Sequence, residues 1–288
     1  METKLRGLLE LLSPYECPCT FHAVRSRLQG LCLEMEMDFW HKNIQGIDVF
    51  LIACLRENQS SVIRVETSKP IREAEAEEFF PLFEECEKAY PLIYEGPLFL
   101  AAADLVSEAF KAFLAPRKIE FTTRKNPVQC FYMTPAQQEK VMALNIALPE
   151  GYRFDKANLE KDAEVITNTW IHSGPYELEQ TKLKLKYCPS ALVRFGNEPV
   201  GFEISTPFGI QNHLFVVEDH RQKGLGKAVE MKMSQECIKF GNVPFKFVEL
   251  WNESVLKRSK KDPIWTHHVD ENGEPITTVF TIFTPKTD

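Results

Sequence analysis

Apolar and polar positions alternate along this chain in two patterns, one typical of strands and one typical of helices. Ala191–Phe195 and Val200–Ile204 are short apolar runs on either side of a Gly-Asn turn, which predicts a β-hairpin. A third apolar run at residues 213–217 predicts another strand. The segment after it has apolar residues three or four positions apart, namely Leu225, Val229, Met233, Cys237 and Phe240. This spacing predicts an amphipathic helix, and Phe245–Trp251 predicts the strand that follows it.

The first half of the chain shows the same mixture. Ile47–Leu55 and residues 61–66 predict strands, Leu98–Leu114 predicts a helix, and Gln129–Met133 predicts a closing strand. The expected fold class is therefore α/β, with helices packed on a mixed sheet. The length of 288 residues allows two domains, and the pattern loosens before Pro149-Glu150-Gly151. We expect an N-terminal α/β domain at 1–146 and a second domain at 147–288.

One loop in the second half is suited to an anion. It joins the strand at 213–217 to the helix that begins near Leu225, so free N–H groups and the positive end of a helix dipole meet there. Gly224 and Gly226 allow close approach of a ligand to the backbone, and Lys223 adds positive charge. The Arg-x-x-Gly-x-Gly pattern fits neither a P-loop nor a dinucleotide-binding turn.

The composition of the chain argues against several classes of function and partner. A net charge of -7 argues against a nucleic-acid partner. The chain has no run of eighteen apolar residues and no clear targeting segment, so we expect no membrane span and an intracellular location, cytoplasmic or mitochondrial. Eight cysteines are scattered without zinc-like pairing, which predicts reduced thiols and no metal. The oligomeric state stays open, and a monomer is compatible with the sequence.

The order of predicted elements and two motifs resemble the GNAT superfamily of acyl-CoA-dependent N-acyltransferases. Arg221, Gly224 and Gly226 fill that family's Arg/Gln-x-x-Gly-x-Gly/Ala pattern. The segment from Asn252 to Ser259 is similar to the glycine N-acyltransferase branch, in which a serine replaces the tyrosine of many GNAT enzymes. The resemblance rests on specific motifs in residues 150–288 and covers the first half more loosely. It implies a GNAT fold preceded by a second α/β domain, and it is compatible with a GNAT-like fold for that domain too.

The resemblance implies acyl-CoA as co-substrate and a coenzyme A site at the loop and the strand ends. The implied residues are Phe215, Val216, Val217, Arg221, Gln222, Lys223, Gly224, Leu225, Gly226, Lys227, Asn252 and Ser254. In this fold, the strand before the loop and the strand after the helix diverge, so the coenzyme arm can make strand-like hydrogen bonds with the first of them.

The implied reaction is transfer of an acyl group from coenzyme A to the amine of glycine or another small amino acid by direct attack. The glutamate expected of a glycine N-acyltransferase is missing at the start of the strand before the loop. His213, with an ordinary pKa near ~6.5, is one candidate base, and Glu203 and Glu249 are alternatives that act through water. Catalysis by proximity alone is a further possibility.

Two other functions stay open at this point. The first is a GNAT enzyme that acetylates a different amine, such as a polyamine, an arylalkylamine or a protein lysine. The second is a non-catalytic acyl-CoA-binding protein, which the missing glutamate would explain.

Overall fold

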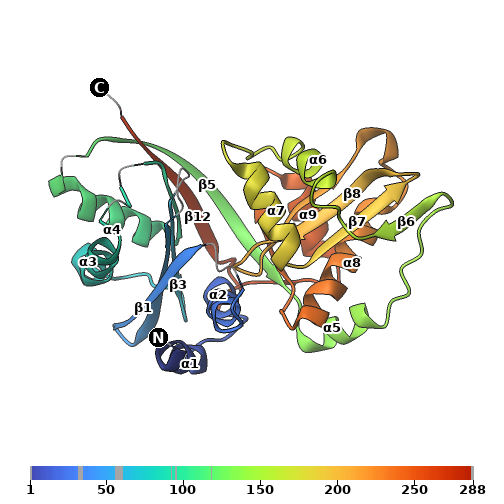
Figure 1. Cartoon of the computed structure of the whole chain (residues 1–288). Coiled ribbons are helices and arrows are strands. Elements are labelled where there is room, and N and C mark those ends of the chain that lie inside the picture. The colour runs from blue at the N-terminus through green and yellow to red at the C-terminus, as the bar shows by residue number, and fades with distance from the viewer. Residues whose placement is uncertain are drawn as a thin grey trace. The chain divides into compact units, whose positions relative to one another are not determined.

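The computed structural model describes residues 2–31, 35–55, 61–91, 93–94, 96–117 and 119–286, and Figure 1 shows its ribbon. The chain divides into two compact units. The first unit consists of Met1–Cys130, Val248–Arg258 and His267–Asp288, and the second unit consists of Phe131–Phe247 and Ser259–Thr266. The predicted division into domains at residues 146 and 147 stays a prediction.

The first unit is built on a mixed sheet. Its strands are β1 (Glu36–Ile44), β2 (Ile47–Leu55), β3 (Ser61–Thr67), β4 (Leu98–Ala102), β5 (Phe121–Tyr132) and β12 (Thr277–Pro285). Its helices are α1 (Glu2–Glu10), α2 (Pro18–Leu28), α3 (Phe80–Ala89) and α4 (Asp104–Leu114), with short 3-10 turns η1 (Ala76–Phe79) and η2 (Ala115–Arg117). The strand order is β1-β2-β3-β4-β12-β5-β10, and β11 (Thr266–His267) pairs with β5.

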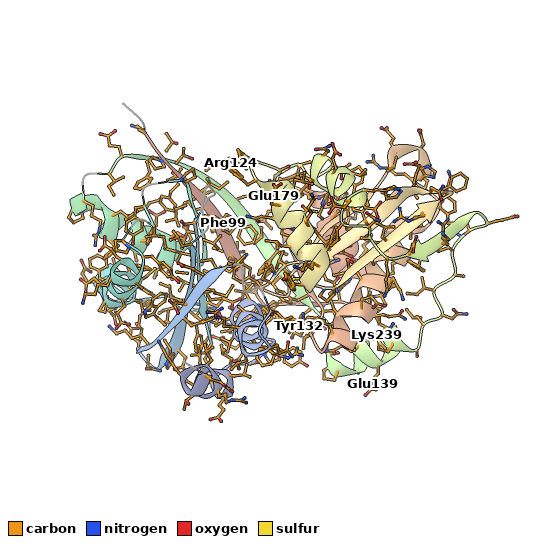
Figure 2. The ribbon with its side chains drawn as sticks, viewed as in Figure 1. Phe99, Arg124, Tyr132, Glu139, Glu179 and Lys239 are labelled. Carbon is orange, nitrogen blue, oxygen red and sulfur yellow. The ribbon has the colours of Figure 1, made fainter. Side chains whose placement is uncertain are left out.

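An aromatic core fills the space between this sheet and the helices α3 and α4. Its phenylalanines come from both helices and from β12, and the Phe83 and Phe110 rings meet edge to face at 5.0 Å. On the strands, alternate residues such as Val49 and Leu51 point into this core. A second aromatic contact joins neighbouring strands, because the Phe99 ring of β4, labelled in Figure 2, lies 5.2 Å from the Phe280 ring of β12.

The second unit has a separate antiparallel sheet. It is ordered β6 (Tyr152–Asp155), β7 (Ser190–Phe195), β8 (Glu198–Ser205) and β9 (Gln211–Val216). The helices are α5 (Pro135–Met142), α6 (Asp162–Asn168), α7 (Glu177–Tyr187), α8 (Leu225–Phe240) and α9 (Glu253–Lys261), with η3 at Glu218–His220 and strand β10 at Phe245–Glu249. By residue number, β5, β10, β11 and α9 each include residues of both units.

The two faces of the four-stranded sheet carry different apolar clusters. On one face Ala191 and Val193 pack against Leu225, Val229 and Met233 of α8. On the other face Leu192, Phe202 and Ile204 pack against Ile166 of α6 and Leu185 of α7. Because successive residues of a strand point to opposite faces, this sheet buries both of its faces in helix contacts.

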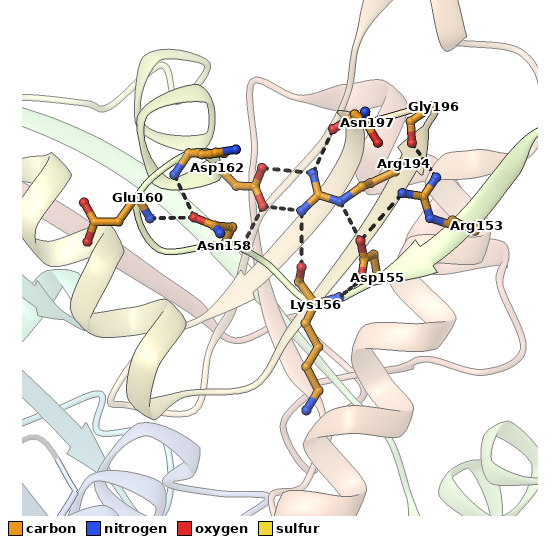
Figure 3. Close-up of polar contacts among 10 residues, drawn as sticks. Arg153, Asp155, Lys156, Asn158, Glu160, Asp162, Arg194, Gly196 and Asn197 are labelled. Carbon is orange, nitrogen blue, oxygen red and sulfur yellow. Dashed lines mark hydrogen bonds and ion pairs between the residues drawn. The ribbon is translucent and has the colours of Figure 1, made fainter.

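A buried arginine ties the start of this sheet to α6. Arg194 on β7 donates to both carboxylate oxygens of Asp162, at 3.0 and 2.6 Å, and to Asp155 at 2.7 Å (Figure 3). Its guanidinium also donates to the main-chain carbonyls of Lys156 and Asn197. The hydrogen bond with Asp162 is the largest cause of the raised pKa of Arg194. All five polar contacts fix the strand, the hairpin turn and the helix start in one arrangement.

The structure confirms the mixed α/β class and corrects one predicted element. Leu98–Leu114 is a strand, Leu98–Ala102, followed by a helix that begins at Asp104. The run from Leu98 to Ala102 is almost wholly buried, and a short run of that kind has no periodicity that separates a strand from a buried helix turn. Strand β1 was also missed, because its residues alternate weakly between apolar and polar.

Three predicted absences can be compared with the described part of the chain. No described helix is long and apolar enough to cross a membrane. Among the described residues, no group of three or more His, Cys, Asp or Glu side chains could hold a metal ion. The cysteines in the described ranges are free thiols, and Cys32 lies outside those ranges.

Candidate functional site

The strand before the glycine loop leaves one edge open. β9 pairs with β8 and is the last strand of its sheet, and the parallel contact with the β10 segment is an isolated bridge between Ile210 and Phe245. Beyond that bridge, the described residues show no pairing between β9 and β10. An edge strand presents main-chain N–H and C=O groups at which an extended ligand can add as a further strand.

A β-bulge interrupts β9 on its paired side. Phe215 pairs with Phe202 and Asn212 pairs with Ile204, so His213 and Leu214 together face the single residue Glu203. His213 has a φ of 60°, which is uncommon for a residue with a side chain. A bulge of this kind bends the strand and re-aims a side chain, and it is frequent beside active sites.

The loop after β9 ends in a left-handed turn that starts α8. Gln222 has a φ of 61° and Gly224, the residue before the helix, has a φ of 80°. No side chain caps this helix start, and its first turn contains no acidic residue. Within the described chain, the N–H groups of residues 224–227 have no hydrogen-bond acceptor. Free N–H groups at the positive end of a helix dipole are the kind of position at which anions bind.

The two glycines of the loop differ in whether the backbone conformation requires a glycine. At Gly224 a side chain would be strained, because only glycine adopts a φ of 80° without cost. At Gly226 an added Cβ would meet only Val216 Cγ2, at 3.8 Å, so the fold leaves room for a side chain. A Cβ at Gly226 would therefore make an ordinary van der Waals contact with Val216, and the fold does not require glycine there.

The cationic side chains of the loop are held at its rim. Arg221 donates through Nε to the Val216 carbonyl at 2.9 Å, and its guanidinium lies 5.6 Å from the Phe215 ring centre. Lys223 donates to the Asp219 carbonyl at 2.9 Å, and Lys227 pairs with Asp262. These contacts orient positive charge around the helix start while Leu225, which is buried, anchors it to the core.

The second motif forms the start of α9. The Asn252 carbonyl accepts from the N–H of Leu256 at 3.0 Å, and Asn252 Oδ1 accepts from the Ser254 hydroxyl at 3.3 Å. Asn252 and Ser254 belong to the first unit, whereas the loop belongs to the second. Ser259, on the same helix, belongs to the second unit, and its buried hydroxyl has no partner in the described chain.

His213, one of the three candidate bases, lies among aromatic rings beside the end of α6. Its ring contacts Phe202 at 5.4 Å and Trp170 at 6.0 Å, and its Nε2 lies 3.3 Å from the Thr169 hydroxyl. The pKa of His213 is lowered from 6.5 to about 4, chiefly by burial and to a smaller extent by the nearby charge of Lys184, against the opposite effect of a hydrogen bond with Thr169. The expected pKa near 6.5 is therefore wrong, and the imidazole is neutral at physiological pH.

The two glutamates occupy other environments. Glu203 is 2% exposed and its charge raises the pKa of Cys237, a residue of the α8 core, so it faces α8 while His213 faces α6. Glu249, at the end of β10, accepts a hydrogen bond from the Asn126 side chain within the first unit. Their roles as bases stay predictions, and neither shares the surroundings of His213.

Two residues of this site carry no sequence signal. Thr169 and Trp170 follow the end of α6 and contact His213 from 44 residues away along the chain. Neither belongs to a motif. Only the packing of α6 on the sheet, which the buried Ile166 anchors, brings them to β9.

Comparison with solved structures identifies the class of fold. A Drosophila protein solved by a structural genomics consortium matches with a TM-score of 0.70 at 14% identity, over 99% of this chain and 97% of that chain. A tandem GNAT protein from the clavulanic acid biosynthesis pathway, solved without acetyl-CoA, matches with a TM-score of 0.54 at 13% identity, over 99% of this chain and 94% of its own. No protein-family model and no curated protein matches the sequence.

The chain thus has the fold of the GNAT acetyltransferases in a two-domain arrangement. Within that fold, the bulged edge strand β9 and the uncapped start of α8 are the features that bear on a ligand.

Proposed function

We propose that the protein is an acyl-CoA-dependent N-acyltransferase that transfers an acyl group to the amine of glycine or another small amino acid. One observation carries the proposal: a bulged edge strand leads through a short loop into a helix start that no side chain caps. The edge suits the extended arm of coenzyme A, and the helix start suits its pyrophosphate.

The coenzyme site follows from this arrangement. The N–H groups of residues 224–227 would hold the pyrophosphate, with Gln222, Lys223 and Lys227 at the rim. The main chain of Phe215, Val216 and Val217 would bind the arm, as the resemblance to GNAT enzymes implies. Asn252 and Ser254 are proposed for the same ligand on that resemblance alone.

The charges near His213 support an amino-acid acceptor. Lys184 and His172 both lower the pKa of His213, so the potential at the imidazole is positive. A polyamine would bring several positive charges to this position and be repelled, whereas the carboxylate of an amino acid would be attracted. Lys184 also pairs with Glu177 at 2.6 Å, and this ion pair reduces the preference.

The proposed reaction is a direct transfer without an acyl-enzyme intermediate. The neutral amine attacks the thioester carbonyl, a C–N bond forms, and the C–S bond breaks. His213 takes the proton that the amine nitrogen loses, and the thiolate takes up a proton as coenzyme A leaves. Placement of the two substrates supplies much of the rate.

A thiol-release assay tests the proposal. Acetyl-CoA and benzoyl-CoA are each offered with glycine, other small amino acids, spermidine, an arylalkylamine and a lysine-containing peptide. Release with glycine or a small amino acid is the expected result. Thiol release only with another amine would show that the acceptor belongs to a different class. Thermal stabilisation by acyl-CoA without thiol release in the presence of any amine would show a binding protein instead of an enzyme.

A further inference from the structure

The hydroxyl of Thr169 has only one hydrogen, and the helix already uses it. Thr169 Oγ1 donates to the carbonyls of Val165 and Ile166, each at 3.0 Å, in the last turn of α6. A side chain that follows the end of a helix often bonds back to the preceding turn in this way. The hydroxyl therefore has no hydrogen left for a third partner, but it keeps a lone pair that can accept one.

That third partner is the imidazole of His213. Nε2 lies 3.3 Å from Thr169 Oγ1, and a main-chain hydrogen bond with Thr169 also contributes to the pKa of His213. With its hydrogen donated to the helix carbonyls, Thr169 Oγ1 acts as an acceptor toward Nε2, which assigns a hydrogen to that ring nitrogen. In a neutral imidazole with hydrogen on Nε2, the lone pair is on Nδ1.

Nδ1 is the nitrogen that this arrangement leaves for a substrate. Among the described residues, the printed side-chain contact of the ring is made by Nε2, and Nδ1 is not one of the buried atoms that lack a partner. The positive φ of His213 and the bulge turn the ring toward α6, and the rings of Phe202 and Trp170 hold it there. Thr169 thus fixes one edge of the ring and leaves the other free.

We propose that Thr169 is a positioning residue that fixes the tautomer of His213, so that Nδ1 is the nitrogen that accepts the proton of the acceptor amine. The inference rests on the proposed N-acyltransferase function, because it assigns an atom to the base of that reaction. The proton moves from the amine nitrogen to Nδ1 as the C–N bond forms, and Nε2 keeps its hydrogen bond to Thr169 throughout.

Three variants separate positioning from packing. Thr169→Val keeps the shape of the side chain and removes the hydroxyl, and Thr169→Ser keeps the hydroxyl. Thr167→Val is the matched control, because Thr167 is a buried threonine on the same helix whose hydroxyl has no partner in the described chain. Turnover is measured with the best acyl-CoA and acceptor pair from the thiol-release assay, and coenzyme A affinity is measured by calorimetry.

We expect Thr169→Val to lower kcat about 10- to 100-fold, within the contribution of a general base, with unchanged coenzyme A affinity. Thr169→Ser should restore most of the turnover, and Thr167→Val should keep the wild-type kcat. Nitrogen NMR of isotope-labelled histidine in the full chain, assigned with His213→Ala, should show hydrogen on Nε2 and a bare Nδ1 at neutral pH.

Two results would overturn the inference. One is a wild-type spectrum with hydrogen on Nδ1 of His213. The other is wild-type kcat in Thr169→Val, whether or not His213→Ala is impaired. Failure of the proposed function looks different, because the wild-type protein then releases no thiol with any amine while the spectrum still decides the tautomer.

Discussion

Both units contain a strand–helix–strand connection, but the two strands of that connection pair with each other to different extents. In the first unit, β3 leads through a turn into α3 and then into β4, which pairs with β3 in parallel from Ser61–Leu98 to Arg64–Ala101. In the second unit, β9 leads through a loop into α8 and then into β10, with a single parallel bridge. The two strands are therefore paired over several residues in the first unit, and they meet at one bridge in the second.

The helix starts differ in charge as well. In the first unit, Glu66 accepts from the N–H groups of Cys19 and Thr20 at the start of α2, and Glu78 accepts from the N–H of Glu75 at the start of η1. Carboxylates of the protein itself thus occupy these helix starts. The start of α8 has no capping side chain and no acidic residue in its first turn. The comparison teaches that the same strand-to-helix connection can have a helix start occupied by a carboxylate of the protein or one without such a carboxylate, and the second kind is where we propose that an anion binds.

Placing a carboxylate at the open helix start should give the largest effect. Gly226→Glu would put negative charge where the pyrophosphate is proposed to bind, and two like charges about 4 Å apart repel by several kcal/mol in a partly screened site. We expect coenzyme A affinity to fall by at least about 100-fold in a calorimetric titration, while the chain stays folded by circular dichroism.

The wild-type titration supplies the control for that comparison. The first unit offers no open helix start at η1, so we expect one coenzyme A per chain, and Glu78→Gln should leave both affinity and stoichiometry unchanged. Two coenzyme molecules per chain, or unchanged affinity in Gly226→Glu, would contradict the difference between the units.

The interiors of the two units differ too, and this can be measured as stability. The core around α3 and α4 is apolar and aromatic, whereas the second unit buries the Arg194–Asp162 pair, whose residues are 8% and 1% exposed. Asp162→Ala would leave the buried guanidinium without its main partner. We expect the free energy of unfolding to fall by about 3 kcal/mol, measured with urea.

A double variant decides whether charge or shape causes that loss. Arg194→Met with Asp162→Leu removes both charges and keeps apolar volume, so it should lose less stability than Asp162→Ala alone. An equal or greater loss in the double variant would show that the main-chain contacts of Arg194 with Lys156 and Asn197 matter more than the ion pair.

Those features of the two units that depend on local sequence could be predicted. The spacing from Leu225 to Phe240 and the loop glycines gave α8 and its start correctly, and the mixed α/β class is confirmed. The coenzyme site itself stays a prediction. Strand order could not be predicted, because β12 enters between β4 and β5 from the far end of the chain. Nor could the pKa of His213, since its burial depends on Thr169 and Trp170, which lie on a distant segment.

Burial of His213 should make stability depend on pH. In the unfolded chain this imidazole takes up a proton as the pH falls below 6.5, whereas in the folded chain it does so only near a pKa of about 4. Protons therefore favour the unfolded state in that interval, and the free energy of unfolding decreases as the pH falls from 6.5 to 4. The charges of Lys184 and His172 lower the pKa of His213 as well and act in the same direction.

Replacing the imidazole isolates its contribution. Between neutral pH and pH 4.5, His213→Gln should lose about 2 kcal/mol less stability than the wild-type protein, because one proton-linked group has been removed. Urea unfolding of both proteins at the two pH values measures the difference. Equal losses in the two proteins would mean that His213 is solvated. The rate of any acyl transfer that uses His213 as base would then fall, as the pH is lowered, near the ordinary pKa of histidine.

The smallest predicted effect distinguishes a glycine that the fold needs from one that the ligand needs. Gly224 has a φ of 80° and is required by the turn, but Gly226 has no such angle and lies within α8 with room for a Cβ. Alanine stabilises a helix relative to glycine by roughly 0.5–1 kcal/mol, so Gly226→Ala should raise the free energy of unfolding by about that amount. Its methyl group would also narrow the approach to the N–H groups, so coenzyme A affinity should fall. A gain in stability with a loss of affinity would show that this glycine is kept at a cost to the fold because the anion must come close. A variant that is both more stable and equally tight would remove the pyrophosphate from this part of the helix start.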